Sequence, residues 1–73
     1  MKMPDAMARD AILEMLERGN GSTEISVANI ATLGHCNAEI ARFALKNMQA
    51  AKEIKVDGSY QGDNDYITIH RLT

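Results

Sequence analysis

The sequence predicts a small α+β fold with three helices followed by a β-hairpin. Apolar residues recur at intervals of three and four in residues 5–18, 27–33 and 37–51, the spacing of helices that bury one face. Toward the C-terminus the interval changes to two, over residues 53–57 and again over 65–70, as expected for half-buried strands. A stretch rich in Gly, Asn and Asp joins these two segments, which is typical of a β-hairpin with a long loop.

Composition limits the size and class of the chain. Its 73 residues are enough for one modest core, so we predict a single domain over residues 1–73. The content of 45% hydrophobic and 25% charged residues is typical of a globular chain. The single cysteine cannot form an internal disulfide, and no apolar run reaches the roughly 18 residues of a membrane span or forms a signal peptide. These features favour a soluble, cytoplasmic protein that does not contact a membrane.

The helix predicted over residues 5–18 has clear signals at both ends. Pro4 and Asp5 suit its start, because proline is tolerated in a first turn and an acidic side chain is favourable at the positive end of a helix. The run Gly19-Asn20-Gly21 ends it. Residues 22–25 then form either a brief third strand beside the hairpin or a loop.

The next two predicted helices form a helix-turn-helix unit. Ser26 can cap the helix over 27–33, because its hydroxyl can accept from the free N–H groups of the first turn. We expect Gly34 to end that helix in the left-handed conformation, which glycine enters without a Cβ penalty. Asn37 is the expected N-cap of the helix over 37–51. Two helices joined by a short turn containing glycine define the helix-turn-helix motif.

The predicted core is mainly aliphatic, since only three aromatic residues are present. We assign Phe43 to this core, and we interpret Cys36 as a small buried hydrophobe without a redox role. The apolar sides of the helix-turn-helix unit are predicted to comprise Val27, Ile30, Ala31, Leu33, Ile40, Ala41, Ala44, Leu45 and Met48.

In this order of elements the chain resembles the winged helix-turn-helix family of DNA-binding domains. Members commonly have Leu-Gly at the turn, a branched apolar residue six positions after that glycine, and Ile or Val at the start of the hairpin, which is called the wing. The matching residues here are Leu33-Gly34, Ile40 and Ile54. The resemblance extends from about residue 5 to residue 70.

The chain departs from the family pattern at three positions. Ile30 stands where the family usually has Ala, four residues before the turn glycine. His35-Cys36 replaces the common pair of an apolar residue followed by Ser or Thr. Lys52-Glu53 stands where a glycine often separates the third helix from the wing. These departures suggest a slightly different turn geometry.

The resemblance implies sequence-specific binding of double-stranded DNA by a small transcriptional regulator. The helix over 37–51 would lie in the major groove, and the wing loop over 58–64 would contact the backbone or the minor groove. Arg pairs with guanine and Asn with adenine, so the candidates for base contact are Asn37, Arg42 and Asn47. The candidates for contact with the DNA backbone are Lys46, Lys52, Lys55, Ser59, Tyr60 and Gln61.

The charge distribution favours DNA binding in one segment and opposes it in others. The net charge is −2, yet residues 37–56 carry four basic and two acidic side chains and include the predicted recognition helix. Three wing aspartates, Asp57, Asp63 and Asp65, would repel phosphate. The alternative is therefore a winged-helix module for protein–protein interaction in replication or assembly, without DNA binding. The sequence is compatible with a monomer and with a homodimer.

Several of these residues can also be explained without any bound ligand. Arg42 and Lys46, with Glu39 nearby, fit an ordinary exposed charged helix face. Tyr60 would either stack on a partner or pack down on the domain. His35, Cys36 and His70 are the strongest metal candidates, but no Cys-x-x-Cys or His-x-x-x-His spacing frames them. We therefore expect no enzyme, no catalytic residue, no metal and no cofactor.

Overall fold

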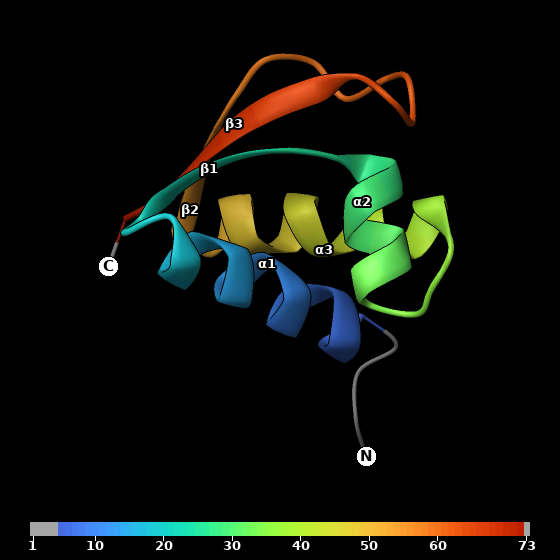
Figure 1. The fold of residues 1–73 in the computed structure, drawn as a ribbon, viewed down its shortest axis with the longest axis horizontal. Coiled ribbons are helices and arrows are strands. Elements are labelled where there is room, and N and C mark those ends of the chain that lie inside the picture. The colour runs from blue at the N-terminus through green and yellow to red at the C-terminus, as the bar shows by residue number, and fades with distance from the viewer. Residues whose placement is uncertain (1–4, 73) are drawn as a thin grey trace.

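The structure, a computed structural model that describes residues 5–72, contains three helices and a three-stranded antiparallel sheet (Figure 1). The elements in chain order are α1 (Ala6–Arg18), β1 (Ser22–Ser26), α2 (Val27–Leu33), α3 (Ala38–Ala50), β2 (Ile54–Asp57) and β3 (Tyr66–Arg71). The predicted α+β class is confirmed, and each predicted bound lies within one residue of the observed one. No helix within residues 5–72 combines the length and apolar character needed to span a membrane.

The sheet places its last strand in the centre. Its order is β1-β3-β2, and β3 runs antiparallel to both neighbours. The segment that the sequence left open between strand and loop is thus β1, with Ser22 opposite His70 and Ser26 opposite Tyr66. The strands lie along one side of the helices in Figure 1, and Ile25, Ile67 and other apolar strand residues are buried in the core.

The core lies between this sheet and the three helices and is built from aliphatic side chains. Its largest fully buried members include Ile12 and Leu16 of α1, Ile30 of α2, and Leu45 and Met48 of α3. Burial of such side chains is the main source of stability in a domain of this size.

The assignment of Phe43 to the core is wrong, because its side chain is 47% exposed. The buried positions of α3 are Ala41, Ala44, Leu45 and Met48. Successive helical residues are rotated by about 100°, so a residue two positions from both Ala41 and Leu45 points away from the core. Leu33, assigned to the apolar side of α2, is the last residue of that helix and is 50% exposed, whereas Val27 and Ile30 are buried.

The turn between α2 and α3 corrects the prediction for Gly34. Gly34 has φ −89°, and the left-handed residue is His35, with φ 53°. Glycine is required at position 34 for a different reason, since a Cβ atom there would lie 2.9 Å from Cα of Ala8 in α1. The absence of a side chain lets the turn pack directly on α1. Cys36, which follows, is half-buried and packs against the core, and burial raises the pKa of its thiol.

The cap residues Ser26 and Asn37 act as predicted. Ser26 Oγ accepts from the N–H of Asn29 at 3.2 Å, which caps α2. Asp5 stands at the N-cap position of α1 and is buried, but its side chain makes no capping hydrogen bond. Pro4, the other residue in the predicted start of this helix, lies outside the described residues.

The connection from α3 to β2 contains a residue in the left-handed conformation that is not glycine. Lys52 has φ 59°, in the left-handed region. The next residue, Glu53, accepts two hydrogen bonds from Nη2 of Arg9 in α1, at 3.0 and 3.1 Å. This partly buried ion pair joins α1 to the start of the hairpin.

Candidate nucleic-acid interface

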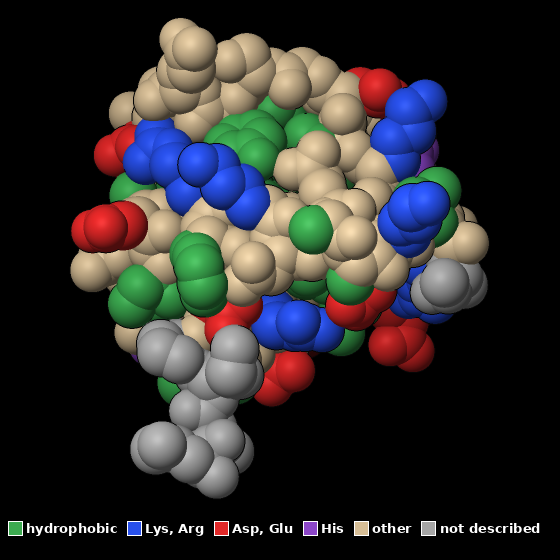
Figure 2. Space-filling view, turned by 180° about the vertical axis from the view of Figure 1, so that it is seen from behind, with side chains coloured by type: hydrophobic (Ala, Val, Ile, Leu, Met, Phe, Trp, Pro, Cys, Tyr) green, Lys and Arg blue, Asp and Glu red, His purple; other side chains and the backbone are tan. Residues whose placement is uncertain are grey.

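The outer side of α3 and the loop between β2 and β3 form one continuous surface. We call it the α3–loop surface and define it by Glu39, Arg42, Phe43, Lys46, Ser59, Tyr60 and Gln61. It contains two adjoining open hollows of about 260 and 290 Å³, and both are lined by Arg42 and Lys46. Figure 2 shows a face on which Lys and Arg side chains stand beside hydrophobic side chains at the floor of a hollow.

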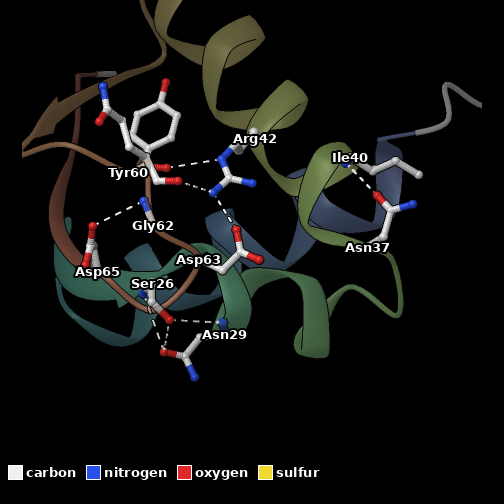
Figure 3. A network of polar contacts seen from close by, with 10 residues as sticks. Ser26, Asn29, Asn37, Ile40, Arg42, Tyr60, Gly62, Asp63 and Asp65 are labelled. Carbon is white, nitrogen blue, oxygen red and sulfur yellow. Dashed lines mark hydrogen bonds and ion pairs between the residues drawn. The ribbon is translucent and has the colours of Figure 1, made fainter.

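Arg42 connects α3 to the loop through three interactions. Its Nε donates to the carbonyl oxygen of Tyr60 at 3.1 Å, and its Nη2 donates to the carbonyl oxygen of Gln61 at 2.8 Å (Figure 3). Nη2 also forms an ion pair with the carboxylate of Asp63. Hydrogen bonds from a charged donor are stronger than those between neutral groups. Arg42 therefore fixes the loop against the helix.

The loop is also tied to α2. The carbonyl oxygen of Asp63 accepts from the N–H of Ala28, in the first turn of α2, at 2.8 Å. Within the loop, the N–H of Gly62 donates to Oδ2 of Asp65 at 3.2 Å (Figure 3). The β2–β3 loop is thus held against both α2 and α3.

These contacts limit how Arg42 could contact a DNA base. A bidentate contact with guanine uses two N–H donors from one guanidinium. In this structure Nε and Nη2 already donate to the loop. Base contact by Arg42 stays a prediction, and paired contact through those two nitrogens would require the loop to give up its hydrogen bonds. Its contact with the loop makes Arg42 a positioning residue in the free protein.

Asn37, the first candidate on α3, is occupied by its role as the N-cap. Its Oδ1 accepts from the N–H of Ile40 at 2.8 Å, and the residue is exposed (Figure 3). The side-chain nitrogen is left as a donor for a ligand. Asn47 is half-buried near the other end of α3 and does not line either hollow.

We expect substitutions of Asn37 to separate capping from any ligand contact. Asn37→Ala should lower the free energy of unfolding by about 1 kcal/mol, because the N–H of Ile40 loses its acceptor. Asn37→Asp should retain the stability, since aspartate caps as well as asparagine, but it loses the amide donor. Urea unfolding followed by circular dichroism measures both effects. Equal stability of Asn37→Ala and the wild type would contradict the capping role.

Tyr60 packs down on the domain. It is half-buried against the core, and its hydroxyl donates to Oε1 of Gln49 in α3 at 2.9 Å. Ser59 and Gln61, on either side, are exposed. Ser59 and Gln61 thus face outward, while Tyr60 anchors the loop to the domain.

The lysines predicted to contact the DNA backbone do not all lie together. Lys46 is exposed and lines both hollows. Lys52 and Lys55 are exposed but line neither hollow, and Nζ of Lys55 lies 3.8 Å from Oδ1 of Asp57. Among the predicted contact residues, the structure brings together Arg42, Lys46, Ser59, Tyr60 and Gln61.

The sequence interpretation missed the exposure of Phe43 and the use of Asp63 as the partner of Arg42. The helical spacing of α3 contains the signal for Phe43, since its neighbours at two positions on either side are core residues. Asp63 carries no comparable signal, because its contact with Arg42 depends on how a long loop folds back over 21 residues of sequence.

A second polar cluster crosses the sheet away from the α3–loop surface. Nδ1 of His70 lies 3.2 Å from Oγ of Ser22, and Nε2 of His70 lies 3.0 Å from Oδ2 of Asp57. The three side chains come from three different strands, so they bridge the sheet. Within residues 5–72, no three His, Cys, Asp or Glu side chains are grouped so that they could hold a metal ion.

No family model, curated protein or solved structure matches this chain. The resemblance to winged helix-turn-helix domains therefore depends on the order of the elements and on the residues at the turn and the hairpin. A function has to be inferred from the geometry and charge of the α3–loop surface.

Proposed function

We propose that this chain is a winged helix-turn-helix domain that binds double-stranded DNA sequence-specifically, as a small transcriptional regulator. In this proposal α3 lies in the major groove, and the loop over residues 58–64 contacts the backbone or the minor groove. The order of helices and strands supports it. The observation that carries it is the attachment of the loop to α3 by Arg42, which makes helix and loop a single surface.

The charge at this surface supports contact with phosphate. Lys46 is exposed beside Arg42, and within residues 5–72 it forms no ion pair. A lysine that neutralises a DNA phosphate releases a condensed counterion, and this release makes binding salt-dependent. We therefore assign phosphate contact to Lys46 first, with Ser59 and Gln61 as neutral donors from the loop.

A second function is favoured by two other observations. Phe43 is exposed in the middle of α3, and exposed aromatic residues are frequent anchors in protein–protein interfaces. The net charge of −2 and the loop carboxylates of Asp63 and Asp65 oppose the approach of DNA. The alternative is thus a winged-helix module that binds a protein through the same surface.

The test is a fluorescence-anisotropy titration of labelled mixed-sequence duplex DNA at low and moderate salt. We expect the wild type to bind and to lose affinity steeply as salt rises. Lys46→Ala should bind more weakly, and its slope of log association constant against log salt should be shallower by about 0.9. Arg18→Ala is the matched control, because it removes one positive charge from α1, outside the α3–loop surface.

Two results would contradict DNA binding through this surface. One is the absence of binding by the wild type even at low salt, which would leave the protein-interaction alternative. The other is an equal change in slope for Lys46→Ala and Arg18→Ala, which would mean that only the total charge matters.

A further inference from the structure

Phe43 occupies the middle of the outer side of α3. Glu39 lies four residues before it and Lys46 three residues after it, so all three share one helix face. The Phe43 side chain is 47% exposed and forms part of the wall of the 290 Å³ hollow, with Arg42, Lys46 and Glu39. An aromatic ring is therefore the central group that α3 presents outward.

The polar groups around it are partly committed to the fold. Oδ1 of Asn37 caps α3, and two of the guanidinium nitrogens of Arg42 hold the loop. The ring of Phe43 has no such role, and its exposed part is available to a ligand. If α3 enters a major groove, the ring is the part of the helix best placed to meet a base edge.

From this arrangement we infer that Phe43 recognises thymine, by packing its ring on the C5-methyl group that thymine exposes in the major groove. This inference rests on the proposed function and specifies the class of duplex, one with thymine opposite the middle of α3. The methyl group is the apolar feature that distinguishes thymine in the major groove, and aromatic and methyl-bearing side chains contact it.

Lys46 gives the ring of Phe43 a cationic neighbour, and it forms no ion pair within residues 5–72. Arg42 and Glu39 line the same hollow, but Arg42 is paired with Asp63, so Lys46 is the cation that can contact a phosphate. A major groove offers the complementary arrangement, with thymine methyl groups on the floor and phosphates along both edges. Lys46 would contact phosphate while the ring of Phe43 contacts the base.

The test begins with a duplex that the wild-type protein selects from a pool of random sequences. This duplex is then prepared in two forms, one with thymine and one with deoxyuridine in place of thymine. Deoxyuridine keeps the base pair and removes only the methyl group. We expect the wild type to bind the deoxyuridine duplex about fourfold more weakly for each methyl group in contact. Phe43→Ala should bind the two duplexes equally, whereas Phe43→Leu should keep part of the preference.

A matched control is Leu13→Ala, which removes an exposed apolar side chain (37% exposed) from α1, outside the α3–loop surface. This variant should keep the full preference for thymine. Retention of the wild-type preference by Leu13→Ala and its loss in Phe43→Ala would establish the contact.

The outcomes that overturn this inference differ from those that overturn DNA binding. A wild type that binds both duplexes equally, or a Phe43→Ala variant that keeps the preference, refutes the contact and leaves salt-dependent DNA binding intact. A selection that enriches no duplex, although mixed-sequence DNA is bound, also refutes it. Failure of the wild type to bind any duplex at low salt refutes both proposals.

Discussion

Replacement of Leu45 by alanine is expected to lower the free energy of unfolding by about 2–5 kcal/mol. Leu45 is 0% exposed and lies in the core on the inner side of α3. Its removal forfeits the burial of several methyl and methylene groups and leaves a cavity that the surrounding side chains fill only in part. A chain of 73 residues has a total stability of roughly 4–11 kcal/mol, so this loss is a large fraction of it.

The matched comparison is Phe43→Ala, two positions away in the same helix. Phe43 points outward, so its removal should change the stability by no more than about 0.5 kcal/mol. Urea unfolding of both variants, followed by circular dichroism, measures the contrast. If Phe43→Ala were as destabilising as Leu45→Ala, α3 would have to be rotated relative to the orientation described above.

A second large effect is expected at the turn before α3. Gly34→Ala should cost about 1–3 kcal/mol, because the added Cβ would lie 2.9 Å from Cα and 3.1 Å from the backbone nitrogen of Ala8. Since the obstruction is backbone, α1 must shift as a unit to relieve it. The change is measured as a shift of the urea midpoint.

Two further variants identify the cause. Ala8→Gly should not rescue Gly34→Ala, because glycine keeps the Cα and N atoms that obstruct the new methyl group. His35→Gly should change the stability by less than about 1 kcal/mol, because relief of the left-handed φ of 53° is offset by the greater freedom of glycine in the unfolded chain. A neutral Gly34→Ala would mean that α1 does not pack on this turn.

The local parts of the fold could be predicted from the sequence because their signals are local. Helical and strand periodicities place every predicted bound within one residue of the observed bound. Ser26 and Asn37 cap α2 and α3, as their chemistry suggests. β1 stayed undecided between strand and loop, because a five-residue segment becomes a strand through its partner. The paired residues of β3 lie 40 to 48 positions away in the sequence.

The errors arose where residue type was weighed above geometry. Phe43 is assigned to the core from the sequence, although its position in the helical repeat lies opposite the buried residues of α3. Gly34 was assigned a left-handed conformation because glycine favours that conformation. Glycine is instead required at this position because the backbone of Ala8 approaches it closely.

The candidate site could be predicted only as a set of residue types. Basic and polar side chains on α3 are visible in the sequence. The contacts of Arg42 with residues 18 to 21 positions away are not, because they depend on the three-dimensional path of the loop.

The central place of β3 has a consequence for the order in which the protein assembles during synthesis. Within residues 5–72, β1 and β2 are joined only through β3, and β3 is the last of the six elements. While a ribosome is still producing the preceding residues, neither strand has a partner, and Ile25 and Ile54 have no finished core in which to bury their side chains. The helices can form from local contacts as they emerge, but the sheet forms only after residues 66–71 have left the exit tunnel. The last of these six elements to emerge therefore completes the hydrophobic core.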